Sequence, residues 1–281
     1  MSQKQQFGGN WTVEKLDILS EYLNFYVTAL KNTPFKKIYI DAFAGSGEIF
    51  LNKNNAIDGS IRLALKAKNK FDEYIFIEKN RKYVKELRKT LEIEFEDLEN
   101  IVDIYNDDCN VVLKFLCNHI DWRKYRAVLF LDPYATEVEW DTLKYIAKTK
   151  AIDLWYLFPF SAVNRLMKKN GEIDRSWREV LNRMFGDTSW EHEFYKEDFQ
   201  LDIWGNTSVY KDVSIDSLSR YLCDRLETLF PKAARPPRVL FNSKNSPLFL
   251  FCFAVANDNP RAIELALRVA NYILNPNRKK N

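Results

Sequence analysis

The sequence predicts an α/β fold built on a mostly parallel sheet of seven strands, of which the last strand is antiparallel. Two observations lead to this fold class. Short, continuously apolar segments alternate with helical segments up to residue 158, which is typical of parallel strands covered on both faces. Two apolar segments, 238–241 and 248–256, then follow with a link of hairpin length between them, so we expect that pair to be antiparallel.

The expected elements can be placed in order along the chain. A first helix is predicted over residues 11–31, because apolar side chains recur at helical spacing at Leu16, Leu19 and Leu23. A second helix is expected to start at the Gly-Ser pair of residues 59–60. The strands are expected at residues 38–44, 74–78, 101–105, 127–131, 151–158, 238–241 and 248–256. Further helices are expected at residues 81–90, 109–118, 138–147, 214–230 and 261–274.

Residues 11–281 are predicted to form a single domain, since no internal repeat and no Ser/Gly-rich linker divides the chain. Residues 161–212 break the alternation of strands and helices and are rich in aromatic residues. We expect them to form a largely helical insertion between the fifth strand and the closing helix and hairpin. Aromatic side chains in such a stretch more often pack in a core than stack on a base.

Composition and charge limit the function. The longest apolar run, residues 247–256, is far shorter than the ~18 residues of a membrane span, so a cytoplasmic protein with no membrane contact is expected. The four cysteines are scattered and imply no disulfide framework. Cys109, Cys117 and His119 match no usual zinc spacing, so no metal is expected. The net charge of +3 permits a nucleic-acid partner without requiring one.

Polar or small residues follow four of the predicted strands, at residues 41–47, Glu78, residues 107–108 and residues 132–134. Ligands of an open parallel sheet bind beyond these carboxyl ends. A turn of small residues lets a ligand approach the backbone, because glycine has no Cβ. An acid at the second end can accept hydrogen bonds from ribose hydroxyls, and an Asp at the third end can accept one from an adenine amino group. The fourth end then faces the reactive part of the ligand.

The glycine pattern does not favour a nicotinamide dinucleotide. That fingerprint requires G-x-G-x-x-G, and the third glycine is missing after Gly45 and Gly47. Glu78 also lies further along than the acid of that fingerprint, because residues 48–58 form an extra segment. The phosphate-binding motif G-x-x-x-x-G-K-[ST] is absent as well.

Two of the strand-end motifs resemble those of class I S-adenosylmethionine-dependent methyltransferases. Residues 41–47, DAFAGSG, resemble the first motif, D-x-F-x-G-x-G, and residues 132–134, DPY, resemble a shortened fourth motif, [DNS]-P-P-[YFW]. More closely, residues 15–164 resemble the three-Cys-motif partner proteins, a prokaryotic methyltransferase-like family. The segments that carry this second resemblance are Lys15 with its helix, DAFAGSGE, DGSIRLAL, FIEKN, NDDCN and FLDPYATEVEW.

The chain is also similar to bacterial ribosomal-RNA adenine-N6 methyltransferases, which carry an insertion after the first motif and then a Gly-Ser-Pro turn. Here that turn is Gly-Ser-Ile, at residues 59–61.

These resemblances imply a Rossmann-like class I methyltransferase fold that binds S-adenosylmethionine. The residues they assign to the cofactor are Lys15, Asp41, Phe43, Ala44, Gly45, Gly47, Ser60, Glu78, Lys79, Asp107, Asp108 and Cys109. The first motif would wrap the methionine part, while Lys15 and Ser60 would approach its carboxylate. Glu78 would bind the ribose, and Lys79 would lie beside the adenine that residues 107–109 hold.

The resemblances assign catalysis to Asp132, Pro133 and Tyr134. Asp132 and the carbonyl of Pro133 would accept hydrogen bonds from the target amino group, and Tyr134 would stack on an extruded base. Transfer would then be in line and would depend mainly on positioning. The fourth motif here is one residue short, because it lacks the second proline that helps set the turn in amino-methylating enzymes.

We therefore predict an S-adenosylmethionine-dependent methyltransferase that methylates an amino group of a base in RNA or DNA. The alternative is a methyltransferase-like interaction protein that binds the cofactor and works with a three-Cys-motif partner protein; the shortened fourth motif favours it. A small-molecule or protein methyltransferase is a third class. No Pro-Cys dipeptide occurs, so a cytosine-C5 mechanism with a Cys nucleophile has no support.

Each motif also has an ordinary structural explanation. The Gly-Ser-Gly turn of residues 45–47 could simply join a strand to a helix. Glu78 and residues 107–108 are residue types that cap helices. Tyr134 could be a core aromatic.

Overall fold

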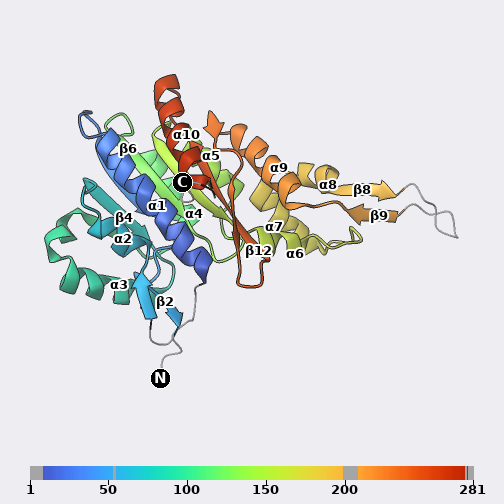
Figure 1. Cartoon of the computed structure of the whole chain (residues 1–281), viewed down its shortest axis with the longest axis horizontal. Helices are drawn as coiled ribbons and strands as arrows, with labels where there is room; N and C mark the ends of the chain where they lie inside the picture. The colour runs from blue at the N-terminus through green and yellow to red at the C-terminus, as the bar shows by residue number, and fades with distance from the viewer. Residues whose placement is uncertain (1–8, 53–54, 199–207, 276, 278–281) are drawn as a thin grey trace.

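The computed structural model describes residues 9–52, 55–198, 208–275 and 277. Its main sheet has the strand order β10-β12-β7-β6-β1-β4-β5, with β11 also paired to β12 (Figure 1). The strands are β1 (Lys36–Asp41), β4 (Glu73–Ile77), β5 (Val102–Tyr105), β6 (Tyr125–Leu131), β7 (Ile152–Phe158), β10 (Lys232–Ala233), β11 (Arg238–Phe241) and β12 (Pro247–Val255). Strands β1, β4, β5, β6 and β7 are parallel to their neighbours in this group.

The predicted fold class is confirmed by this strand order. The last strand, β12, runs antiparallel to β7, with Leu250 opposite Phe158. The sheet has eight strands where seven were expected, because the strand beyond β12 consists of two short pieces, β10 and β11. Between these pieces lie Pro236 and Pro237, which have no N–H group to donate to a ladder. The arrangement is a Rossmann-like, mostly parallel sheet.

Helices cover both faces of the sheet. One face packs against α4 (Cys109–His119), α5 (Trp140–Lys148) and α9 (Ile215–Glu227). The other face packs against α1 (Asn10–Ala29), α2 (Ser60–Lys66), α3 (Arg81–Glu94) and α10 (Pro260–Leu274). A short helix, η1 (Glu96–Ile101), leads from α3 into β5. Ile38 and Ile40 of β1 belong to the first core and Tyr39 to the second, as the two-residue period of a strand requires.

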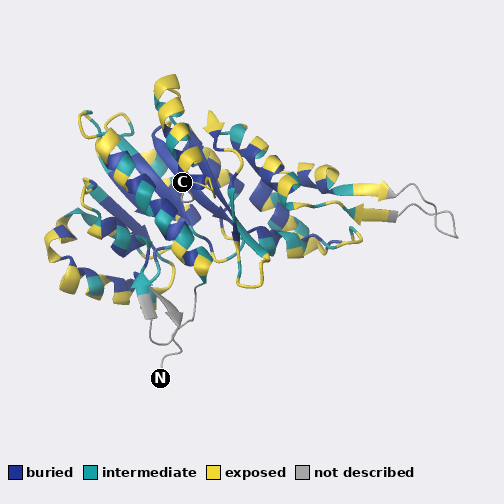
Figure 2. Ribbon diagram, in the orientation of Figure 1, coloured by how far each residue is buried: buried dark blue, intermediate teal, exposed yellow. Residues whose placement is uncertain are grey.

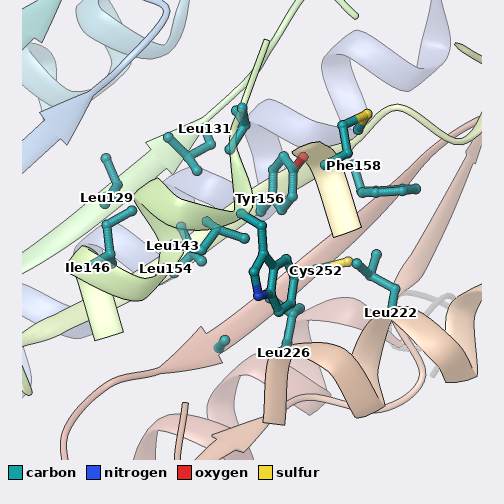
Figure 3. Close-up of a cluster of buried hydrophobic side chains, with 14 of the residues drawn as sticks. Leu129, Leu131, Leu143, Ile146, Leu154, Tyr156, Phe158, Leu222, Leu226 and Cys252 are labelled. Carbon is teal, nitrogen blue, oxygen red and sulfur yellow. The ribbon is translucent and has the colours of Figure 1, made fainter. Parts of the chain in front are cut away.

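The central strands of the sheet are buried along most of their length (Figure 2). On the face covered by α4, α5 and α9, aliphatic and aromatic side chains from neighbouring strands meet side chains of the helices (Figure 3). The labelled members of this cluster are Leu129, Leu131, Leu143, Ile146, Leu154, Tyr156, Phe158, Leu222, Leu226 and Cys252. Because the strands are held on both faces, the loops at their ends are carried by a rigid base.

The stretch of residues 161–212 contains helices and one strand pair. The helices are α6 (Phe160–Leu166), α7 (Arg175–Phe185) and α8 (Ser189–Phe194), followed by β8 (Tyr195–Asp198) and β9 (Ser208–Lys211). Phe185, Trp190 and Phe194 are fully buried, so these aromatic residues belong to the core. The β8–β9 pair extends away from the main sheet (Figure 1). Residues 199–207, part of the expected insertion, lie outside the described residues.

The extra segment after the first motif forms a second small hairpin, β2 (Glu48–Asn52) and β3 (Asn55–Asp58). Within the described ranges, no helix combines the length and the apolar content that crossing a bilayer requires.

Candidate functional site

A cavity of about 820 Å³ opens at the carboxyl edge of the sheet. The loops after β1, β4, β5 and β6 line it, together with the first turns of α1, the start of α2, one side of α3 along its length and residues 248–249 of β12. Ligands of open parallel sheets bind at this edge. The predicted site residues in its lining are Lys15, Phe43, Ala44, Gly45, Gly47, Ser60, Glu78, Lys79, Asp107, Asp108, Cys109, Asp132, Pro133 and Tyr134.

Asp41 lies beneath the cavity, with no exposed surface. Its carboxylate accepts hydrogen bonds from the Phe43 backbone N–H at 3.2 Å, the Tyr39 hydroxyl at 3.3 Å and the Ser60 hydroxyl. Burial raises the pKa of Asp41 to about 6, and the bond from Ser60 opposes the rise. Asp41 therefore fixes the turn and the start of α2. The contact with the cofactor that the resemblance implies for Asp41 stays a prediction.

Two glycines give the first loop its shape. Gly45 has φ of +61° and Gly47 has φ of +87°, in the left-handed region that other residues adopt only with strain. A Cβ on Gly45 would meet no atom within 4 Å, so its backbone faces open space. The carbonyl of Gly47 accepts a hydrogen bond from the Gly59 N–H at 3.1 Å, which ties the loop to the start of α2. The backbone of this loop therefore forms its surface toward the cavity at the two glycines.

Glu78, at the end of β4, joins two loops through one carboxylate. One oxygen accepts a hydrogen bond from the Gly45 N–H at 2.8 Å, and the other accepts one from the Asn80 N–H at 2.7 Å. An ionised carboxylate has about four lone-pair positions, so two positions remain for a ligand. The side chain can therefore order the first loop and still accept hydrogen bonds from ligand hydroxyls.

Asp108 caps helix α4 and accepts hydrogen bonds from three groups. The Asn110 backbone N–H lies at 2.9 Å, its side-chain amide at 3.0 Å and the Lys79 ammonium group at 3.1 Å. Burial raises the pKa of Asp108, but the bonds from Asn110 and Lys79 outweigh it and lower the pKa overall. Asp108 is therefore an anion at neutral pH, with Lys79 spanning the gap between the second and third loops.

The neighbours of Asp108 have different roles. Asp107 accepts a hydrogen bond from the Asp108 N–H at 2.7 Å and so shapes the turn. Cys109 is buried, and burial raises the pKa of its thiol to about 12, so it is not a nucleophile at neutral pH. Among the described residues, no group of three or more His, Cys, Asp and Glu side chains is arranged to hold a metal ion.

Asn110 connects the third and fourth loops, and the sequence did not single it out. Its amide nitrogen donates to Asp108 and, at 2.9 Å, to the carbonyl of Glu137. Its oxygen accepts from the Glu139 N–H at 3.0 Å and the Thr142 hydroxyl at 2.8 Å. All four hydrogen-bonding positions of the amide are used. In the sequence, Asn110 could be recognised only as a polar residue of the NDDCN segment, in the first turn of α4.

Asp132 meets Lys15 at the fourth strand end. The Lys15 ammonium group forms an ion pair with the Asp132 carboxylate, although the two residues belong to β6's loop and to helix α1. Lys15 is only 4% exposed, and its ammonium group lies 5.0 Å from the centroid of the Trp11 ring. Pro133 is buried, whereas Tyr134 is 60% exposed, so its ring stands at the rim of the cavity.

Several lining residues were missed from the sequence. Trp11 and Phe249 form an aromatic wall with ring centroids 5.0 Å apart, and Tyr83 of α3 lines the cavity near Lys82. Periodicity cannot reveal such a wall, because α1 and β12 meet only in the folded chain. Seven carboxylates and five basic side chains line the cavity, which leaves two formal negative charges in excess. The cavity thus suits a ligand with positive charge.

The lining also contains an unsatisfied group. The hydroxyl oxygen of Thr12 is buried and has no hydrogen-bond partner among the described residues. Buried hydroxyls are normally paired, so this oxygen is available to a ligand that reaches the first turn of α1. Together with the acceptors Glu78 and Asp108, it gives a donor and acceptor set that fits an adenosyl amino acid.

Comparisons with known proteins are consistent with the fold and go no further. No family model matches the sequence, and the search of curated proteins finds no match. A Legionella pneumophila protein of family DUF519 is similar in structure over 76% of this chain and 92% of its own, with 13% identity and a TM-score of 0.39.

Two further solved structures carry methyltransferase descriptions. The methyltransferase domain of bacterial Hen1 is 12% identical over 85% of this chain and 98% of its own, with a TM-score of 0.40. A putative S-adenosylmethionine-dependent methyltransferase from Listeria monocytogenes is 9% identical over 86% and 98%, with a TM-score of 0.39. These values describe a likeness and carry no argument about what this chain does.

Proposed function

We propose that this chain binds S-adenosylmethionine and transfers its methyl group to an amino group of a base in RNA or DNA. The observation that carries the proposal is the convergence of four strand-end loops and Lys15 on one cavity. The excess of carboxylates in the lining favours a cationic ligand, and the sulfonium cofactor is cationic. Bound there, S-adenosylmethionine would supply a methyl group that its sulfonium makes electrophilic.

The residues that would hold the cofactor would each contact a different part of it. Glu78 would accept hydrogen bonds from the ribose hydroxyls with its remaining lone pairs. Asp108 would accept from the adenine amino group, and Lys79 would cover the adenine edge. Lys15 and the unpaired hydroxyl of Thr12 would serve the amino-acid carboxylate. The backbone of residues 43–47 would form the remaining wall, because its glycines admit close approach.

The target amino group would be held by the fourth loop. The Asp132 carboxylate and the Pro133 carbonyl would each accept a hydrogen bond from one N–H of the target amino group. This arrangement would direct the nitrogen lone pair to the methyl group. The N–C bond would form as the S–C bond breaks, and the extra proton on nitrogen would leave to water. The exposed ring of Tyr134 would stack on the base. Before it could accept a hydrogen bond from the substrate, Asp132 would have to release its ion pair with Lys15.

Labelled-methyl transfer tests the proposal directly. Wild-type protein would be incubated with methyl-labelled cofactor and with separate pools of RNA, DNA and protein. We expect label in a nucleic-acid pool, and we expect Asp132→Ala to abolish transfer while calorimetry still detects cofactor binding. Label confined to the protein pool would exclude a nucleic-acid substrate, and an absence of cofactor binding by wild type would end the proposal.

A second function is favoured by one observation, the ion pair that occupies Asp132. An interaction protein that keeps the cofactor pocket but transfers no methyl group could retain this pair permanently. It would act with a partner such as a three-Cys-motif protein. Saturable cofactor binding without transfer to any pool, in the presence and absence of such a partner, would favour this function.

A further inference from the structure

Helix α3 carries a strongly basic surface beside the cavity. Of the nine residues from Arg81 to Lys89, five are basic and only Glu86 is acidic. The five are Arg81, Lys82, Lys85, Arg88 and Lys89. At 3.6 residues per turn they fall within about 120° of the helix circumference, away from the buried side chains Val84 and Leu87. We call these five residues the basic face of α3.

The basic face is almost free of ion pairs. Of its five side chains, Lys82 alone has a carboxylate of a described residue within ion-pair range, with its ammonium group 3.9 Å from Glu86. Within the described part of the chain, no carboxylate lies in ion-pair range of Arg81, Lys85 or Arg88, and all three are exposed. A solvated surface that served only solubility would gain by alternating its charges, as other surfaces of this protein do. Examples are the pairs that Lys66 and Lys114 form.

The charge pattern also weakens the helix that carries it. Arg81 and Lys85 are four residues apart, as are Lys85 and Lys89, and like charges at this spacing destabilise a helix. The first turn contains two cations and no acid, although the N-terminus of a helix favours negative charge. A structural role for α3 does not explain this destabilising arrangement, whereas binding of phosphates to its surface does.

The basic face is continuous with the rim of the cavity. Lys82 and Lys89 line the cavity as well as belonging to the basic face, and Tyr83 of the same helix and the exposed Tyr134 line it too. The sign of the charge therefore changes across this rim, because carboxylates are in excess inside. From Arg81 to Lys89 the helix rises about 12 Å, enough to span two or more phosphates of a strand.

We propose that the basic face of α3 binds the phosphate backbone of a single-stranded nucleic acid whose base enters the cavity beside Tyr134. This inference rests on the proposed function, because it names the surface that holds the substrate of that site. The negative interior would repel phosphates while the positive rim attracts them, so a flipped base could enter and its backbone could not. The single-stranded form is favoured because its base can enter the cavity without the free-energy cost of unpairing a duplex.

Fluorescence anisotropy with short labelled single-stranded RNA and DNA, measured from low to moderate salt, tests the surface. The variant is Arg81→Glu/Lys85→Glu/Arg88→Glu, whose three positions lie outside the cavity lining. Its matched control is Arg220→Glu/Arg261→Glu/Arg268→Glu, on α9 and α10, which makes the same change in net charge at exposed positions. We expect the α3 variant to bind about tenfold or more weakly, with a salt slope shallower by about two. The control should change both quantities much less.

The outcomes separate this inference from the proposed function. Equal losses in the two variants would show that net charge and not the basic face binds the strand, and would overturn the inference. Displacement of the strand by polyglutamate at equal charge concentration would also overturn it, in favour of an acidic protein partner. Cofactor calorimetry and a melting curve on each variant keep the test valid, because cofactor affinity should match wild type and the melting temperature should not fall below it. Failure of methyl transfer with intact, α3-dependent strand binding would remove the proposed function alone.

Discussion

The ammonium group of Lys15 in helix α1 forms an ion pair with the carboxylate of Asp132, which lies 117 residues further along the chain. The pair joins the first helix to the loop that would hold the substrate. Lys15 is almost fully buried, whereas the Asp132 side chain keeps 22% of its surface exposed. Removing one partner of such a pair leaves the other charge poorly solvated.

Asp132→Ala should therefore destabilise the protein as well as abolish transfer. We expect the free energy of unfolding in urea to fall by about 3 kcal/mol, because the Lys15 ammonium loses its counter-charge. The double variant Lys15→Met/Asp132→Ala should recover much of that loss, since the buried charge is then gone. Equal stability of the single and double variants would show that the unpaired charge of Lys15 is not the cause of the loss.

Glu78→Ala should reduce cofactor affinity through two losses. It removes the acceptor proposed for the ribose and frees the Gly45 N–H that orders the first loop. Together these should weaken binding by about 100-fold in calorimetry, corresponding to two charge-assisted hydrogen bonds. Glu86→Ala is the matched control, since its carboxylate also lines the cavity but accepts no hydrogen bond from a loop N–H of the residues that the structure describes. A similar loss in both variants would mean that the charge of the cavity, and not Glu78 itself, sets the affinity.

Asn110→Ala should impair positioning more than cofactor binding. Its amide holds the backbone of residues 137–139 against α4, so its loss frees the loop that begins at Asp132. We expect kcat to fall by about tenfold or more while cofactor affinity changes little. Asn118→Ala, an exposed change on the same helix, is the control. A fall in cofactor affinity equal to the fall in kcat would contradict a positioning role.

The sheet and its strand ends could be predicted because their signals are local. Each strand is a short apolar run, and the motif residues follow directly in the chain, so Gly45, Glu78 and Asp108 were found without coordinates. The small strands β2, β3, β8, β9 and β10 were missed, because each has only two to five residues. Among the described residues, β2 pairs only with β3 and β8 only with β9, in separate two-stranded sheets, and β10 pairs at an edge of the main sheet.

The contacts between loops could not be predicted, because they depend on how distant segments meet. Asn110 has no sequence motif that reveals its four hydrogen bonds, and the aromatic wall of Trp11 and Phe249 joins the two ends of the chain. The sequence associated Lys15 with the cofactor carboxylate, whereas the structure adds its ion pair with Asp132. Burial of Asp41 and its hydrogen bonds to the first loop could not be predicted either, and its contact with the cofactor stays a prediction.

Asp153, at the opposite end of the sheet, should make stability depend on pH. Burial raises the pKa of its carboxyl from 3.8 to about 7, while the hydrogen bond from the Tyr22 hydroxyl at 2.5 Å lowers it in part. The folded protein therefore binds a proton that the unfolded chain releases above pH 4. This contribution is complete below about pH 4 and is lost as the pH rises through about 7.

Asp153→Asn should remove this dependence. Between pH 4.5 and 6.5, one linked proton changes the free energy of unfolding by about 1.4 kcal/mol per pH unit, and the variant should lack a slope of that size. Urea titrations at several pH values measure it, with Asp103→Asn as the exposed control. Asp41 contributes in the same direction, because its pKa is raised to about 6, so part of the slope should persist in the variant. An identical slope in wild type and Asp153→Asn would mean that Asp153 is ionised in the folded protein.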